Sequence, residues 1–147
     1  STVSRGFKTF DNRVTYEKNF WSIKCSHDGY LSKYGVIHQR TLEFDPNKHI
    51  IFGKEKLIKK KNFKSTNFEI RFHLLPNLKI TKIQDNKSVL IELENSGWRF
   101  FSKDGLIGVE TGLYFGNKNN YIENQNIFIS GITQNDEQVI EWQISKI

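Results

Sequence analysis

The feature that most constrains this chain is a two-residue alternation of apolar and polar side chains. In residues 68–74 the alternation is strict, so Phe and Ile/Leu side chains point one way while Glu, Arg and His point the other. Residues 89–94 and 140–144 show the same period. Because no segment keeps a helical period over ten residues, the pattern predicts β-strands that bury one face.

Short polar turn signals separate these alternating runs. Parallel strands need crossovers of about a dozen residues or more, so strands joined by tight turns are expected to pair antiparallel. The turn signals are Asp45-Pro46-Asn47-Lys48, Gln84-Asp85-Asn86-Lys87, Glu94-Asn95-Ser96-Gly97, Lys103-Asp104-Gly105 and Gln134-Asn135-Asp136-Glu137.

The runs and turns predict about ten strands or slightly more, with little or no helix. The expected strands are residues 13–17, 19–27, 35–45, 49–58, 64–75, 78–84, 87–94, 97–103, 106–115, 121–131 and 137–146. A chain of 147 residues suits a single domain, and this many strands should form two packed sheets. The prediction is an all-β, antiparallel β-sandwich over residues 1–147. Trp142 alternates with Ile140 and Ile144, so we expect it in the core.

The composition narrows the classes of function. The net charge of +6 favours polyanionic partners such as nucleic acid, acidic lipid or acidic polysaccharide, although it could also serve only solubility. The single cysteine, Cys25, excludes an internal disulfide and a multi-cysteine metal site. No apolar run approaches the ~20 residues that span a membrane, so no membrane partner is expected. Since the chain has no methionine, we expect it to be an excised piece of a longer protein.

The densest cluster of reactive residue types is His27-Asp28-Gly29-Tyr30. Histidine and tyrosine transfer protons, and the glycine permits a tight turn that could present His27 and Tyr30 beyond a strand end. The alternative is a structural turn in which Asp28 bonds to local backbone. His27 and Tyr30 are therefore candidates for contact with substrate.

A second candidate group consists of His38 and Arg40, and of Arg71 and His73. Each pair is two residues apart on an expected strand, so its members share a face. If the two strands were neighbours, that face would carry two histidines and two guanidinium groups, which suit a carboxylate or sulfate. The alternative is a solvated outer face paired with acids such as Glu43 and Glu69. We expect no metal here, because no spaced carboxylate ligand accompanies His38 and His73.

One run of lysines stands out across an expected strand end and turn. It could contact phosphate or sulfate groups of a polyanion, or it could be a solvated loop. The run consists of Lys54, Lys56, Lys59, Lys60, Lys61 and Lys64. Aromatic residues could instead supply stacking platforms for sugars, although such side chains more often fill a core. These are Trp21, Trp98, Trp142, Tyr30, Tyr34, Tyr114 and Tyr121.

Several segments, taken in order, resemble the C-terminal domain of the heparinase II/III family of polysaccharide lyases. They are His27-Asp28-Gly29-Tyr30, Gly35-Val36-Ile37-His38-Gln39-Arg40, Arg71-Phe72-His73-Leu74 with Pro76 shortly after, Trp98-Arg99-Phe100 and Tyr114-Phe115-Gly116. The second segment is similar to the family pattern Gly-Val-x-His-x-Arg, and the third to Arg-Phe-His-Leu. The resemblance extends over nearly the whole chain, from Ser1 to Ile147.

The resemblance implies a two-part enzyme, with an N-terminal α/α toroid packed against a C-terminal antiparallel β-sandwich. It also implies β-elimination from a uronic-acid polysaccharide, in which the carboxylate charge is neutralised and a Tyr or His transfers the proton from C5. Its substrate class implies a periplasmic or extracellular location. The toroid would hold most catalytic groups, so we expect the present chain to be inactive alone and to have the missing helical domain as a partner.

Many family members bind a structural divalent metal such as zinc through two His and one Asp. The last of these His precedes a short segment that Ser1-Thr2-Val3 resembles, so the ligands would lie upstream of this chain. We therefore expect no cofactor in this fragment.

Two other classes of function stay open. One is a freestanding carbohydrate-binding sandwich, which predicts a polar surface with a small aromatic platform. The other is a basic nucleic-acid-binding β-domain, the less favoured reading, which predicts strongly salt-dependent binding without sugar selectivity. A domain that docks on a toroid should instead expose an apolar patch on one sheet face or edge.

Overall fold

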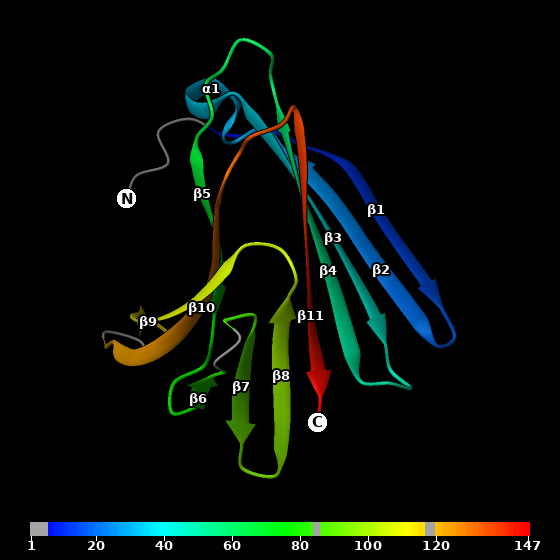
Figure 1. Cartoon of the computed structure of the whole chain (residues 1–147). Helices are drawn as coiled ribbons and strands as arrows, with labels where there is room; N and C mark the ends of the chain where they lie inside the picture. Colours follow the sequence, from blue (N-terminus) through cyan, green and yellow to red (C-terminus); the bar gives the residue numbers. More distant parts are fainter. Residues whose placement is uncertain (1–5, 84–85, 117–119) are drawn as a thin grey trace.

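The regular secondary structure is almost entirely β-strand in a computed structural model that describes residues 6–83, 86–116 and 120–147 (Figure 1). The strands are β1 (Thr9–Glu17), β2 (Phe20–His27), β3 (Val36–Asp45), β4 (Ile50–Lys59), β5 (Asn67–His73), β6 (Lys79–Lys82), β7 (Ser88–Leu93), β8 (Ser96–Ser102), β9 (Leu106–Tyr114), β10 (Ile122–Ile132) and β11 (Glu137–Lys146). One helical turn, α1 (Leu31–Tyr34), joins β2 to β3. The all-β, antiparallel prediction is confirmed.

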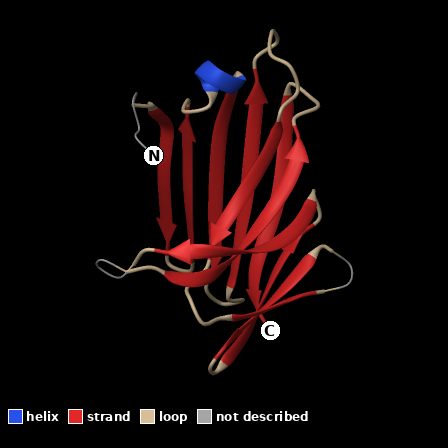
Figure 2. Cartoon of the chain, turned by 90° about the vertical axis from the view of Figure 1, so that its left-hand side faces the viewer, coloured by secondary structure: helices blue, strands red, loops and turns tan. Residues whose placement is uncertain are grey.

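The strands form two antiparallel sheets of unequal size. The larger has eight strands in the order β1-β2-β3-β4-β11-β8-β7-β6, and the smaller has the order β5-β10-β9. Figure 2 shows the smaller sheet in front of the larger one, its strands running obliquely across. The arrangement is a β-sandwich, as predicted. A single sheet face that carries both His38 and Arg71 would require their strands to be neighbours. They are not neighbours, because β3 and β5 belong to different sheets.

Apolar residues from both sheets fill the space between them. Ile70 of β5 is buried, and the other apolar residues of residues 68–74 pack against the core, as the alternation predicts. Trp142 is also buried, and its ring centroid lies 4.7 Å from that of Phe72 and 5.9 Å from that of Phe100. A Cβ at Gly53, opposite Trp142 on β4, would clash with the indole, so this position needs glycine.

The smaller sheet leaves part of the larger one uncovered at β1 and β2. Val14 pairs with Ile23 and Tyr16 with Trp21, and the Trp21 ring contacts Phe44, so these side chains share the face that carries the core. Val14 and Tyr16 are nonetheless 73% and 78% exposed. We call Val14, Tyr16, Trp21, Ile23 and Phe44 the β1–β2 apolar face. In the described residues, no helix has the length and apolar character needed to cross a membrane.

Candidate functional site

A cleft of about 520 Å³ opens between the two sheets at the end that carries α1. The end of β2, α1, the start of β3 and the start of β5 line it. It brings together five of the six residues that the sequence singles out as close to substrate: His27, Tyr30, His38, Arg40 and Arg71. The sixth, His73, does not line the cleft. Its Nδ1 lies 3.1 Å from the Oδ1 of Asn126 on β10.

The turn after β2 presents Tyr30 at the mouth of this cleft. The carboxylate of Asp28 accepts a hydrogen bond from the Lys8 backbone N–H (2.7 Å), which ties the turn to the segment before β1. Gly35 ends α1 with a positive φ of 66°, and the ring of Phe63 packs against it. Tyr30 is about half exposed, and no hydrogen bond to its hydroxyl is found in residues 6–83, 86–116 or 120–147.

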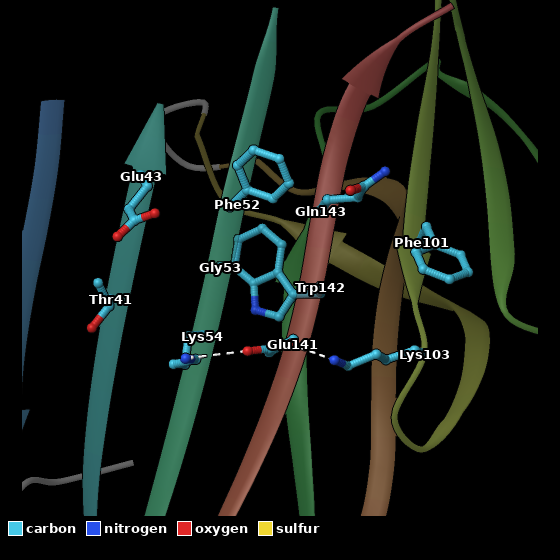
Figure 3. Close-up of a pocket in the computed structure, with 10 residues that line it drawn as sticks. All are labelled: Thr41, Glu43, Phe52, Gly53, Lys54, Phe101, Lys103, Glu141, Trp142 and Gln143. Carbon is cyan, nitrogen blue, oxygen red and sulfur yellow. Dashed lines mark ion pairs between the residues drawn. The ribbon is translucent and has the colours of Figure 1, made fainter. Parts of the chain in front are cut away.

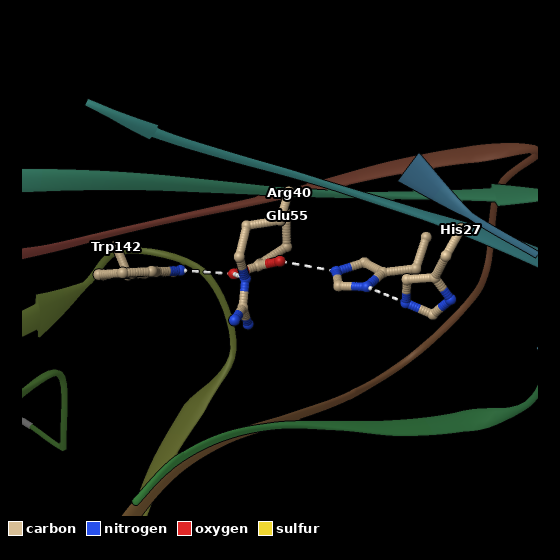
Figure 4. A network of polar contacts seen from close by, with 5 residues as sticks. His27, Arg40, Glu55 and Trp142 are labelled. Atoms are coloured by element: carbon tan, nitrogen blue, oxygen red, sulfur yellow. Dashed lines mark hydrogen bonds and ion pairs between the residues drawn. The ribbon is translucent and has the colours of Figure 1, made fainter. Parts of the chain in front are cut away.

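A chain of hydrogen bonds runs inward from this turn (Figure 4). The Gly29 backbone N–H donates to Nδ1 of His27 (3.2 Å), Nε2 of His27 meets Nδ1 of His38 (3.1 Å), and Nε2 of His38 meets Glu55 Oε2 (2.7 Å). A backbone N–H can only donate, so His27 Nδ1 accepts and its proton is on Nε2. His38 then accepts at Nδ1 and donates from Nε2 to the carboxylate. Both nitrogens of both histidines are thereby engaged.

Glu55 is fully buried, and both of its carboxylate oxygens are used. Oε1 accepts from Arg40 Nε (2.7 Å) and from the Trp142 indole N–H (3.0 Å), while Oε2 accepts from His38. Burial pushes the pKa of Glu55 up, but the His38 hydrogen bond, the Arg40 charge and the Trp142 N–H outweigh it and hold the pKa below its ordinary value. Glu55 therefore stays ionised inside the sandwich.

Strand register explains why these groups meet. Arg40 lies opposite Glu55 on β3 and β4, and His27 lies opposite His38 on β2 and β3. The interpretation of His38 and Arg40 as a solvated outer face paired with Glu43 is wrong, because they point between the sheets toward Glu55. We call His27, His38, Arg40, Glu55 and Trp142 the Glu55 network.

Burial and charge set the behaviour of the remaining groups in the cleft. Burial first, then electrostatic repulsion from the adjacent His38 ring, lowers the pKa of His27 below its usual value. Arg40 uses only Nε within the network. Its two terminal nitrogens have no partner among the described residues and point away from Glu55 (Figure 4). Arg71, in contrast, forms ion pairs with Glu69 and Glu110. The pair with Glu69 agrees with the alternative interpretation of a solvated outer face.

The lysine run divides into two parts. Lys54 and Lys56 lie on the outer face of β4 and pair with Glu141 (3.1 Å) and Glu137 (2.7 Å) of β11. The other four, at the end of β4 and in the turn to β5, form no ion pair with any described residue. These are Lys59, Lys60, Lys61 and Lys64. Their turn lies at the same end of the sandwich as α1 and the cleft (Figure 1).

Glu55 is the most deeply buried member of the site, but it is not among the site residues predicted from the sequence. It lies between Lys54 and Lys56, inside the lysine run. The two-residue alternation of β4 is a signal for its burial, because it places Glu55 on the same inner face as Gly53 and Leu57. Among the described residues, no three His, Cys, Asp or Glu side chains gather as metal ligands. Ser1-Thr2-Val3 lies outside the described residues.

Comparison with known proteins decides the family. Residues 2–143 match the model of the heparinase II/III-like C-terminal domain. The chain belongs to this family. A sequence comparison with curated proteins finds no significant match.

Solved structures show the same fold. The heparan sulfate lyase HepC from Pedobacter heparinus superposes with a TM-score of 0.79 at 13% identity, over 95% of this chain and 22% of that one. The heparinase III BT4657 gene product superposes with a TM-score of 0.75 at 12% identity, over the same shares of the two chains. The present heparinase II/III-like chain thus spans about a fifth of the length of the lyases it matches.

Proposed function

We propose that this chain is the C-terminal domain of a lyase that cleaves a uronic-acid polysaccharide by β-elimination, and that it helps to bind the acidic polymer at the cleft between the sheets. One observation carries the proposal: the cleft presents an unpartnered guanidinium end, on Arg40, together with an unpartnered phenol hydroxyl, on Tyr30. The guanidinium suits the binding of an acidic polymer, and the phenol hydroxyl suits proton transfer.

The reaction assigns each group a task. A base removes the proton at C5 of the uronate, the C4–O bond breaks, a C4=C5 double bond forms and the leaving oxygen receives a proton. The C5 proton is weakly acidic until the adjacent carboxylate is neutralised, and a guanidinium binds a carboxylate in bidentate fashion. We assign Arg40 to the carboxylate and Tyr30 to proton transfer. His27 and His38 position the Glu55 network, because neither has a free nitrogen.

The rest of the lyase would come from a separate helical domain. The β1–β2 apolar face offers a place for it, since exposed apolar side chains that share one sheet face mark an interaction surface. This face also favours a docked domain over a freestanding carbohydrate-binding module. The chain alone would then lack most catalytic groups and be inactive.

The remaining parts of the proposal concern the complete protein. A structural divalent metal such as zinc would be held by residues upstream of this chain, and no step here passes through it. A polymeric acidic substrate would be met in the periplasm or outside the cell. Nucleic acid is not the proposed ligand.

The test is to express the complete reading frame and, separately, this chain, and to incubate each with heparan sulfate and with alginate. Unsaturated uronate products absorb in the ultraviolet, so elimination is followed directly. We expect absorbance to rise with the complete protein and not with this chain. If the complete protein binds these polymers but does not cleave them by elimination, the chain is part of a carbohydrate-binding protein and the proposal is overturned.

A further inference from the structure

A second hollow lies on the outer face of the larger sheet, on the opposite side from the Glu55 network. It has a volume of about 330 Å³ and is lined by side chains from β3, β4, β11 and β8 (Figure 3). Outward-pointing residues of these strands form its floor, and it shares no side chain with the cleft. Gly53 and the core residue Trp142 also line the hollow, but the other lining side chains point outward and the core does not require them, so their arrangement calls for another explanation.

Two rows of side chains cross the strands in this hollow. In the first, Gln143 of β11 lies opposite Phe52 of β4 and opposite Phe101 of β8. The two rings are therefore two strand spacings apart, about 9–10 Å. Figure 3 shows one ring on each side of the amide. Phe52 is 42% exposed although it lies in the middle of a sheet, whereas Phe101 is only partly exposed and the Arg99 guanidinium lies 5.3 Å from its ring centroid.

The second row is an ion-pair line parallel to the first. Glu141 accepts from Lys54 Nζ (3.1 Å) on one oxygen and from Lys103 Nζ (2.6 Å) on the other. The Lys103 hydrogen bond first, and then that of Lys54, lowers the pKa of Glu141, which keeps the row ionised. Thr41 and Glu43 of β3 extend the two rows, and the hollow as a whole carries two positive and two negative groups.

This combination matches the surface of a saccharide. The C–H faces of a pyranose pack on aromatic rings, while its hydroxyl groups need both donors and acceptors. The Gln143 amide supplies both and has no hydrogen-bond partner among the described residues. The ring spacing is on the scale of a disaccharide unit. A protein partner fits less well, because covering the Glu141 ion pairs without new hydrogen bonds would cost desolvation energy.

We propose that this hollow binds an extended saccharide chain that runs across the strands, with one pyranose on Phe52, one on Phe101 and the linkage over Gln143. The site is separate from the cleft and would hold the polymer outside it. The binding claim stands by itself, whereas the polymer-holding role rests on the proposed function.

The binding test uses this chain with three tetrasaccharide probes, from heparan sulfate, from alginate and from uncharged cellulose, by calorimetry. We expect at least one probe to bind, and Phe52→Ala and Phe101→Ala each to weaken it about tenfold, as the loss of a stacked ring predicts. Val139→Ala is the matched control, since Val139 is another exposed apolar residue on the outer face of β11 outside the hollow. Absence of binding by every probe, or equal weakening by the control, would overturn the proposal.

A second measurement separates this inference from the lyase proposal. In the complete protein, Phe52→Ala should slow elimination from long polymer and leave elimination from a tetrasaccharide unchanged. A complete protein without lyase activity that still binds the probe through Phe52 would contradict the proposed function while supporting this site. If Phe52→Ala instead releases another domain or subunit and leaves saccharide binding unchanged, the face is a protein interface and the inference fails.

Discussion

The imidazole of His38 donates from Nε2 to the fully buried carboxylate of Glu55 across 2.7 Å, and its tautomer is fixed because its Nδ1 accepts from His27. The direction of the whole chain is set at its outer end by the Gly29 backbone N–H. A surface turn is thereby connected to an ionised group in the core. Several measurable consequences arise from this link.

Glu55→Gln should lower the free energy of unfolding by roughly 2–3 kcal/mol. An amide offers one acceptor oxygen in place of two and adds donors that face His38 or Trp142, and each unsatisfied buried donor costs about 1–3 kcal/mol. Urea unfolding would measure the change. Glu43→Gln, on the exposed outer face of the neighbouring strand β3, is the control and should change stability by less than about 0.5 kcal/mol. Equal losses in the two variants would contradict a special role for Glu55.

The same variant has a pH signature. Because the pKa of folded Glu55 lies below its ordinary value, the carboxylate stabilises the fold above that ordinary value. The contribution is lost as pH falls through the folded pKa. Glu55→Gln should therefore be less sensitive to acid than the wild type below about pH 4.5. An acid limb unchanged by the variant would mean that other carboxyl groups control acid unfolding.

A separate prediction concerns His27 and the pH dependence of stability at higher pH. Its folded pKa is lowered, mainly by burial, so between that pKa and the usual 6.5 the unfolded chain binds more protons than the folded one. Stability should rise with pH through this window. His27→Asn should flatten the rise, as measured by urea unfolding at several pH values. His49→Asn, in the exposed β3–β4 turn, is the control, and an equal loss of slope in both variants would reject the assignment.

Gly53→Ala should destabilise the protein by about 1–3 kcal/mol, the usual cost of overpacking. The new Cβ would meet the indole of Trp142 and displace it from Glu55 and the core, so the tryptophan fluorescence should shift as well. Gly97→Ala on β8 is the matched control, since the nearest atoms to its Cβ are 3.8 Å away on Ile147. Retention of full stability in Gly53→Ala would show that the indole can move at little cost.

The sequence predicts the strands well because alternation and turn residues are local signals. Every expected strand has a counterpart, although β1 begins at Thr9 instead of residue 13, where a register irregularity interrupts its pairing. The four-residue helix α1 lies in a gap between expected strands. A single turn is too short to show a helical period.

Pairing and burial across strands could not be predicted in the same way. The placement of Arg71 on a different sheet from His38 depends on long-range topology, which alternation does not encode. Glu55 illustrates the same limit. A carboxylate between two lysines has the pattern of a solvated strand, and only the register with Arg40 and the Trp142 indole explains its burial. The Gly29 to Glu55 chain likewise needs three separate elements to be placed.

Under the proposed function, Tyr30→Phe should reduce elimination by the complete protein about 10²-fold or more, the usual contribution of a proton-transferring group. Stability should change by less than about 0.5 kcal/mol, because the exposed hydroxyl has no partner in the described residues. Ultraviolet absorbance of the products measures the rate. Tyr34→Phe, a second exposed tyrosine that lines the cleft, is the control. Similar losses in both would argue against proton transfer by Tyr30.

The unpaired lysines at the cleft end should govern the salt-dependent part of polyanion binding. The triple variant Lys60→Ala, Lys61→Ala and Lys64→Ala should weaken heparan sulfate binding at low salt, and the difference from wild type should shrink as added salt screens the charges. Affinity measured at several salt concentrations would test this.

A triple variant with the same loss of charge at the opposite end of the strands provides the comparison. Lys18→Ala, Lys48→Ala and Lys146→Ala remove lysines beside the β1–β2 turn, in the β3–β4 turn and at the end of β11. If only net charge matters, both triples should weaken binding equally. A larger effect at the cleft end would place the polymer across the mouth of the cleft, where the Arg40 guanidinium and the Tyr30 hydroxyl lie.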